Sequence, residues 1–529
     1  MGNYVYIDGG EIAMLVDDEP VNMPNNDTLI VDLSQSWTID DVEFIPVNKT
    51  PSGVLNLNDG FLFPAADNKS FFQFGGESTW LLYTPRNPTS VTQFTIEDHG
   101  NGSWAQFEPG SSSGFEDITR PSRALATTVD NTFFILGGFL DSHSAENTAS
   151  IQGLDNYPLK GIVAWNMTSG IWTNDSMPSH LVRPDGLNGI LTSVPTYGPG
   201  GLLLAGGTGT VNNAAPRFDN ITIYEPRDKT WHYQSATGDI PAGRNGPCTV
   251  GVPGDNGTYE IFMYGGEQNQ GGGQLTSSQA QLNVDLDAVY ILSLPAFAWF
   301  RASYLANHPR YMHTCHVIGN RHMLTIGGLS PLDAGKDTMS QDHETNGLGL
   351  WDLTNLKWID AYDADAAPYK TPQIVKDWYQ ENGTSSVQWN DDAVKAFFRQ
   401  SDAATTGSTA PLTTETSGPS PANHKSTSTP VGAIAGGVVG GVAVICLLAA
   451  LFFWFFRHRQ QRQPQSPSPH QNELADTSET HKFELSGWER RQEAESGKLA
   501  WEKDGTQRME LDGAQPRERK PMELMGSSG

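Results

Sequence analysis

Six short apolar runs that each end in two adjacent glycines constrain the fold most strongly. The pairs are Gly9-Gly10, Gly75-Gly76, Gly137-Gly138, Gly206-Gly207, Gly265-Gly266 and Gly327-Gly328. Their first glycines follow one another at intervals of 59 to 69 residues. Recurrence at a nearly fixed period of this size indicates a repeat architecture, in which each repeat is one supersecondary unit.

A tryptophan follows each glycine pair after 24 to 34 residues; the six are Trp37, Trp104, Trp172, Trp231, Trp299 and Trp358. A second run rich in Val, Ile, Tyr and Phe lies between each pair and its tryptophan, as is typical of strands. Glycine permits positive φ and close approach of backbones, and a tryptophan ring can fill the space between two sheets. We therefore predict an all-β fold in which small sheets pack radially as a six-bladed β-propeller.

The pattern resembles the kelch repeat, in which a double glycine follows the second strand of a blade and a tryptophan lies on the fourth. The kelch arginine before the first strand has possible counterparts in Arg123, Arg244 and Arg310. The resemblance covers about residues 1–365 and implies a kelch-type propeller over residues 1–368. A β-sandwich with unrelated Gly-Gly turns is the alternative.

The first predicted blade is incomplete, because only three residues precede Tyr4 and no first strand can stand there. A secretory signal is also missing from the start of the sequence. One hypothesis is that the natural N-terminus is longer and this start is truncated. The other is that Tyr369–Val375 adds the missing strand from the C-terminal side. Residues 369–400 are predicted to be a closing segment with a short helix capped by Asn390 and Asp391.

Two cysteines, Cys248 and Cys315, fall in the first strands of the adjacent fifth and sixth blades. A disulfide between them is possible in an oxidising compartment. Counted from Arg244 and Arg310, however, they lie four and five residues on, which puts them on opposite strand faces unless the strands are staggered. A disulfide and two buried free thiols both remain open. The third cysteine, Cys446, lies in an apolar run.

The C-terminal part of the sequence predicts a membrane anchor. Residues 401–430 contain 14 Ser or Thr and 4 Pro, which indicates an extended stalk. Residues 431–456 carry no charge and are followed by Arg457 and Arg459, which predicts one transmembrane helix with the propeller outside the plasma membrane. Glycines spaced by four in this span, at 432, 436 and 440, would allow a homodimer.

Residues 457–529 are predicted to be a disordered cytoplasmic tail. The tail repeats one short pattern, [Phe/Met]-Glu-Leu-x-Gly, at Phe483–Gly487, Met509–Gly513 and Met522–Gly526. We expect these copies to be read by a cytoplasmic partner, although drift in a low-complexity tail would also explain them.

Nine Asn-x-Ser/Thr sequons precede the predicted span. They are candidate N-glycosylation sites if that side of the membrane is lumenal. The asparagines are Asn26, Asn48, Asn68, Asn101, Asn166, Asn174, Asn220, Asn256 and Asn382.

No catalytic residue, cofactor site or metal site is predicted. The formal charge of −27 argues against nucleic acid as a partner. His313 and His316 should point to opposite faces of a strand and so cannot share a metal, and we expect His313 to be a satisfied core residue. One loop gathers residues that could bind a cation but are expected to be solvated: Asp333, Asp337, Asp342, His343 and Glu344.

The order of parts resembles that of single-pass kelch-repeat membrane proteins of filamentous fungi. The resemblance implies a cell-surface binding or scaffold protein that recognises an extracellular protein or glycan and is not an enzyme. Two alternatives stay open: a galactose-oxidase-like or other sugar-active propeller enzyme, and a cell-wall or adhesion component. The oxidase would need a tyrosine cross-linked to a cysteine at a copper site.

Overall fold

The computed structural model describes residues 1–399 with gaps at 17–18, 50–51, 80–90, 111–112, 119, 152–156, 182–188, 208–217, 268–285, 304–308 and 331–343. The chain divides into two compact units, Met1–Pro411 and Leu412–Gly529, and every described residue lies in the first. The predicted stalk, membrane span and tail lie outside the described residues. Within the described residues, no helix has both the length and the apolar character needed to cross a bilayer.

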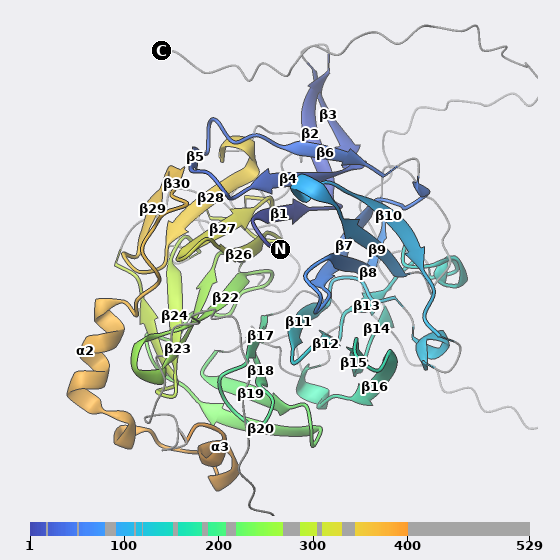
Figure 1. Ribbon diagram of the computed structural model, residues 1–529. Helices are drawn as coiled ribbons and strands as arrows, with labels where there is room; N and C mark the ends of the chain where they lie inside the picture. Colours follow the sequence, from blue (N-terminus) through green and yellow to red (C-terminus); the bar gives the residue numbers. More distant parts are fainter. Residues whose placement is uncertain are drawn as a thin grey trace, which may run out of the picture. The chain divides into compact units, whose positions relative to one another are not determined.

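Six antiparallel sheets follow one another along the chain as blades (Figure 1). Blade one contains β1 (Tyr4–Ile7), β4 (Asp27–Asp32) and β6 (Ile45–Asn48). Blade two contains β7 (Leu57–Pro64), β8 (Ser70–Ser78), β9 (Val91–Ile96) and β10 (Gly102–Phe107). Blade three contains β11 (Leu125–Val129), β12 (Thr132–Leu136), β15 (Gly161–Asn166) and β16 (Ile171–Ser176).

The other three blades repeat this order. Blade four contains β17 (Ile190–Val194), β18 (Leu202–Gly206), β19 (Asn220–Glu225) and β20 (Thr230–Ser235). Blade five contains β22 (Cys248–Pro253), β23 (Tyr259–Tyr264), β24 (Val289–Leu294) and β25 (Ala298–Arg301), and β21 (Thr237–Gly238) pairs parallel to β25. Blade six contains β26 (Thr314–Ile318), β27 (His322–Ile326), β28 (Leu348–Asp352) and β29 (Lys357–Ile359).

Three two-stranded pairs are separate from the six main sheets. β2 (Glu11–Val16) and β3 (Glu19–Pro24) form a hairpin in blade one, and β13 (Phe139–Leu140) pairs with β14 (Tyr157–Pro158) in blade three. β5 (Trp37–Thr38) pairs with β30 (Ala361–Tyr362). Single 3-10 turns occur at Asp98–Gly100, Phe115–Asp117, Glu146–Thr148, Ser179–Leu181, Asp255–Gly257, Thr345–Gly347 and Thr384–Ser386.

Six apolar clusters lie between successive blades and close the ring. One cluster is shared by each neighbouring pair, and the last combines Val5 and Val31 of blade one with Ile318 and Leu350 of blade six. A small sheet cannot bury both of its faces alone, so each blade depends on the two beside it. The predicted six-bladed propeller is confirmed. In the described residues, blade one has three strands.

The glycine pairs join each blade to the next. Both glycines have positive φ in five of the six pairs, and in the fourth pair only Gly207 does. The amide of the second glycine donates a hydrogen bond to a carbonyl that leads into the following blade: Gly10 to Leu57 (2.9 Å), Gly76 to Pro121 (2.7 Å) and Gly266 to Arg310 (2.6 Å). Positive φ and close backbone approach together explain why both positions favour glycine.

The tryptophans pack against the preceding blade. Trp104 donates a hydrogen bond to Thr28 of blade one at 2.8 Å, and Trp299 donates one to the Phe218 carbonyl at 3.0 Å. Five of the six lie on fourth strands, but Trp37 lies on β5 instead of β6. Trp37 still contacts the preceding blade through Tyr362, with ring centroids 5.2 Å apart. The prediction of a fourth-strand tryptophan was therefore wrong for blade one.

The segment between Tyr369 and Val375 does not supply a strand to blade one. It leads into α2 (Gln373–Asn382), and Val375 packs into the apolar cluster between blades five and six. Blades one and six are joined instead by the β5–β30 pair and by a hydrogen bond from the Tyr362 hydroxyl to the Leu33 carbonyl at 3.2 Å. The alternative that this segment completes blade one was wrong.

The buried arginine of blade three is Arg120 and not Arg123. Arg120, Arg244 and Arg310 are each at most 4% exposed and donate to the carbonyl of a paired glycine. Arg123 is half-buried, has a φ of 49° and pairs with Asp59 at 3.0 Å. The Pro121 and Arg310 carbonyls accept equivalent hydrogen bonds from Gly76 and Gly266, so Pro121 and Arg310 occupy equivalent positions. The arginine of blade three, Arg120, therefore lies one residue before the position that Arg310 occupies in blade six.

Residues 369–399 form a strap across blades four to six. α2 contributes Trp378 and Tyr379 to the blade five–six cluster, and α3 (Asp392–Phe397) contributes Val394 to the blade four–five cluster. Asp391 caps α3 by accepting a hydrogen bond from the Val394 amide at 2.8 Å, as predicted. Figure 1 shows both helices on the outer rim of the ring. The sequence analysis missed α2.

Candidate functional site

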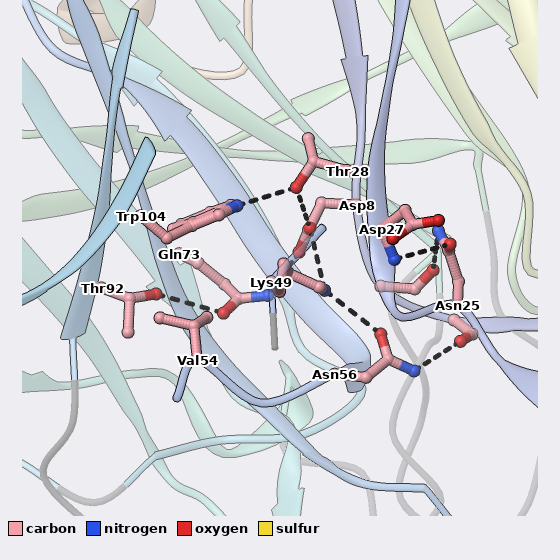
Figure 2. A network of polar contacts seen from close by, with 12 residues as sticks. Asp8, Asn25, Asp27, Thr28, Lys49, Val54, Asn56, Gln73, Thr92 and Trp104 are labelled. Atoms are coloured by element: carbon pink, nitrogen blue, oxygen red, sulfur yellow. Dashed lines mark hydrogen bonds and ion pairs between the residues drawn. The ribbon is translucent and has the colours of Figure 1, made fainter. Parts of the chain in front are cut away.

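A fully buried ion pair lies between blades one and two. The Lys49 ammonium is 2.9 Å from the Asp8 carboxylate, and these side chains are 2% and 0% exposed. Figure 2 shows the polar groups around the pair. Asp8 also accepts hydrogen bonds from Thr28 (2.7 Å) and Gln73 (2.6 Å), and Lys49 donates to Asn56 (3.4 Å).

This network leaves neither charge open to a ligand. Asp8 directly precedes the first glycine pair, Thr28 belongs to β4, and Gln73 belongs to β8 of the next blade. Thr28 in turn accepts a hydrogen bond from Trp104. A buried charge pair with all of its neighbours hydrogen-bonded is a structural joint, and we assign it that role.

Glu260 is a second buried charge, and it faces the strap. Its carboxylate accepts hydrogen bonds from the hydroxyls of Tyr369 (3.1 Å), Thr371 (3.4 Å) and Ser293 (3.3 Å). Burial raises the pKa of Glu260 to about 7, although its hydrogen bonds act in the opposite direction. Tyr379 of α2 adds a hydrogen-bond contact to Ser293 at 3.1 Å. Glu260 therefore holds the strap to blade five.

We expect the propeller to lose stability as pH rises from about 5 to 8. An unfolded glutamate titrates near 4.5, so between 4.5 and about 7 the folded state binds more protons than the unfolded state. The contribution is fully present below pH 4.5 and is lost as pH rises through 7, with an effect of about 3 kcal/mol. Glu260→Gln should flatten this dependence in thermal unfolding, and exposed Glu381→Gln should not. An unchanged pH slope in Glu260→Gln would contradict this role.

Cys248, Cys315 and His313 gather where blades five and six meet. The structure joins the two cysteines as a disulfide with Cα atoms 5.5 Å apart. Both strands begin four residues after their arginines, and Cys248 is the first residue of β22 whereas Cys315 is the second of β26. Neighbouring blades turn opposite faces toward the apolar cluster that they share, so this difference of one residue directs the two side chains toward each other.

His313 lies against the same cysteines but has no hydrogen-bond partner among the described residues. Both ring nitrogens are buried and unsatisfied, so the expectation of a satisfied core histidine was wrong. Burial, and then the charge of Arg310, lower the pKa of His313 to about 3, and the imidazole is neutral at physiological pH. His316 is exposed and does not join the cluster. These three ligand-type side chains are the part of the molecule best suited to a metal.

An open groove of 760 Å³ lies on blade six and the segment that follows it. Its lining combines charged side chains with apolar ones and includes one indole. The residues are Arg321, His322, Asp352, Asn355, Lys357, Trp358, Ile359, Asp360, Ala361, Asp363, Asp365, Ala366 and Ala367. Surface grooves of this size on a rigid scaffold are typical recognition sites.

The charges of the groove divide into a fixed pair and exposed carboxylates. Arg321 donates to the Asp352 carboxylate at 2.7 Å, which fixes both side chains on the inner wall. Asp360, Asp363 and Asp365 are exposed, and within the described part of the chain none of them forms an ion pair. The half-buried Trp358 is held by Tyr264 and Trp351, with ring centroids 5.0 and 5.3 Å away.

All nine sequon asparagines are exposed. Four of them belong to strands of blades one, three and four: Asn48, Asn166, Asn174 and Asn220. Four lie on connections between strands, namely Asn26, Asn68, Asn101 and Asn256, and Asn382 ends α2. Other asparagines of the described part are not uniformly exposed: Asn25 and Asn56 are buried, and Asn58 and Asn131 are half-buried. The sequon side chains are therefore accessible to solvent, although the Asn48 amide donates a hydrogen bond to Asp27 at 2.9 Å and the Asn382 amide donates one to the Trp378 carbonyl at 3.0 Å.

The remaining sequence-based candidates fall mostly outside the described residues. In the predicted cation loop only Glu344 is described, and it contributes the N-cap of a short turn. The sequence analysis missed Asp8, Lys49 and Glu260. Asp8 stands next to a glycine pair and Glu260 begins an apolar run, but neither position by itself reveals burial.

Comparison with known proteins adds little to this description. No family model matches the sequence, and no curated protein matches it. A solved structure described as "Structure of YjhT" is similar over 62% of this chain and 89% of its own, with 12% identity and a TM-score of 0.37. A likeness of that degree carries no inference, so the six-bladed assignment rests on the sheets and clusters of this chain.

Proposed function

We propose that this chain is a cell-surface binding or scaffold protein, a membrane-anchored glycoprotein whose propeller faces the outside. The exposure of all nine sequon asparagines carries the proposal, because a secreted face tolerates glycans only where they project into solvent. The disulfide between Cys248 and Cys315 supports an oxidising compartment. The charge-free run at 431–456 would then be the anchor.

Binding fits the described residues better than turnover. The two cysteines of the described part are joined to each other, so neither can be cross-linked to a tyrosine as a galactose-oxidase-like copper site requires. The groove on blade six offers fixed polar walls and exposed carboxylates. We propose this groove as the recognition surface for a protein or glycan. The repeated tail motifs would engage a cytoplasmic partner, and the glycine-rich span would allow a homodimer.

A cell-wall or adhesion role is the second candidate, and the composition of the groove favours it. An indole can stack on a sugar ring while carboxylates beside it accept hydrogen bonds from the sugar hydroxyl groups. Trp358, Asp363 and Asp365 provide these groups on one lining.

Intact cells that display the full-length chain test the orientation and the binding role together. Endoglycosidase should increase the electrophoretic mobility of the chain, and protease added to intact cells should digest the propeller. Beads carrying β-glucan, chitin or mannan should be captured by the cells if the ligand is a wall polymer. Asp363→Ala with Asp365→Ala should reduce capture about tenfold, as the loss of about 1.4 kcal/mol would.

The matched control is the double variant Glu108→Ala with Glu381→Ala, which removes two exposed charges far from the groove lining. It should capture beads like the wild type. Unchanged mobility together with protection from protease would refute the outside orientation. Capture of none of the three polymers would refute the wall role and leave a protein ligand, to be sought by cross-linking from position 363.

A further inference from the structure

We propose that Cys248, Cys315 and His313 form a site for a soft divalent metal ion of the Zn²⁺ class, available only when the disulfide is reduced. The ligand atoms of the three residues all lie within 4.8 Å of one another. The site stands independently of the proposed function, because it depends on the joint between two blades and not on an outside ligand.

Three separate backbone positions converge on this point. Cys248 opens β22 of blade five, Cys315 lies in β26 of blade six, and His313 directly precedes β26. Their exposures are 6%, 8% and 5%, so all three side chains are buried. The ring of Tyr264 meets His313 edge to face at 5.4 Å and covers one side. The ligands therefore come from two blades whose positions are already fixed by the ring.

The disulfide alone does not explain His313. Neither ring nitrogen has a hydrogen-bond partner in the described part of the chain, and a buried polar group without a partner costs about 1–3 kcal/mol. Disulfide sulfurs are weak hydrogen-bond acceptors, so they offset little of the free-energy cost of burying the imidazole. A metal ion would bind the lone pair of His313 and both sulfurs at once, so one bound ion would explain the placement of all three residues.

The donor set selects the ion. Two thiolates and one neutral imidazole are ligands that Zn²⁺ takes in tetrahedral sites, with a fourth position for water or an external ligand. Two thiolate charges balance a divalent cation, so the occupied site carries no net charge in its buried surroundings. Hard cations such as Mg²⁺ and Ca²⁺ prefer oxygen ligands and are excluded by the same chemistry.

The oxidised and metal-bound forms exclude each other. A dithiol reductant opens the S–S bond by giving two electrons and two protons to the cysteines, and the reductant itself becomes a disulfide. Zn²⁺ then replaces the two thiol protons, which pass to solvent. Loss of the ion and reoxidation restore the S–S bond. Blades five and six would thus be joined by a covalent bond in one state and by a metal in the other.

Co²⁺ titration of the purified full-length chain tests the site. Cys446→Ser serves as the background, because it removes the remaining thiol. The chain is reduced with dithiothreitol, desalted without oxygen and titrated with Co²⁺ as a spectroscopic probe for Zn²⁺. We expect one equivalent to bind with a thiolate-to-cobalt charge-transfer band and to be displaced by Zn²⁺. The oxidised chain should show no such band.

Matched histidine variants separate a built site from chance binding. His313→Ala should weaken Co²⁺ binding about 100-fold or more, since even outer-shell changes cost about 10–100-fold. His316→Ala removes an exposed histidine of β26, three residues further along the chain, and should change nothing. Equal binding by His313→Ala and wild type, or Co²⁺ bound without a thiolate band, would show an adventitious ion only and overturn the proposal.

Folding of the reduced chain provides a second test of the metal site. If the reduced chain loses its near-ultraviolet circular dichroism, adding Zn²⁺ should restore it, because metal binding and folding are linked. Cys315→Asp cannot form the disulfide but keeps a ligand oxygen, and it should bind Zn²⁺ without any reductant. A reduced chain that neither stays folded nor refolds with Zn²⁺ would also overturn the proposal.

Discussion

Lys49→Met should lower the free energy of unfolding by about 3–5 kcal/mol, because it leaves the Asp8 carboxylate buried without its countercharge. Thr28 and Gln73 would still donate to that carboxylate, but neither carries a positive charge. Urea denaturation followed by tryptophan fluorescence measures the change. The loss is large because Asp8 lies where blades one and two meet and cannot move into water without separating them.

Two further variants show whether the effect comes from the buried charge. Asp8→Asn combined with Lys49→Met removes both charges and should recover most of the loss, since a neutral pair leaves no uncompensated ion. Lys229→Met breaks an ion pair of 2.7 Å whose side chains are 49% and 33% exposed, and it should cost under about 1 kcal/mol. A loss in Lys49→Met no larger than that in Lys229→Met would show that the buried pair is not a structural joint.

Gly76→Ala is the second variant with a large expected effect. Gly76 has a φ of 78°, and a Cβ there would lie 2.5 Å from the Asn58 carbonyl oxygen and 2.8 Å from the Gly60 Cα. Left-handed backbone costs an alanine about 1–2 kcal/mol, and overpacking against backbone costs about 1–3 kcal/mol more. We expect a total loss of about 2–5 kcal/mol in urea denaturation.

Gly327→Ala is the matched control, because it shares the conformation without the crowding. Its φ is 64°, and a Cβ there would meet no atom within 4 Å. Its cost should stay at about 1–2 kcal/mol. Equal losses in the two variants would mean that backbone conformation alone, and not the close approach of the neighbouring strand β7, explains the double glycine.

The blades could be predicted from the sequence because their signals are local. An apolar run, two glycines with positive φ and a tryptophan on the last strand recur in one repeat after another, and each signal reflects a nearby contact. The exceptions are two contacts made by a residue that lies at a different position of its blade from the one that the repeat predicts. Trp37 contacts Tyr362 from β5, and the arginine of blade three that donates to a paired glycine is Arg120 and not Arg123.

The candidate sites could not be predicted because they depend on distant partners. Glu260 becomes a strap anchor only through Tyr369 and Thr371, more than 100 residues away. The meeting of Cys248 and Cys315 depends on which faces two neighbouring blades turn toward each other, and no spacing within one strand reveals this. Burial of His313 without a hydrogen-bond partner is likewise a property of the assembled ring.

The sharing of each apolar cluster by two blades has a consequence for a molecule exposed to proteases. A single cut in a surface connection would separate the chain into two pieces, yet clusters on both sides of the cut blade would keep the pieces interlocked. A nicked molecule should therefore migrate as one particle until denaturant is added, with its blades still assembled after the backbone has been cut.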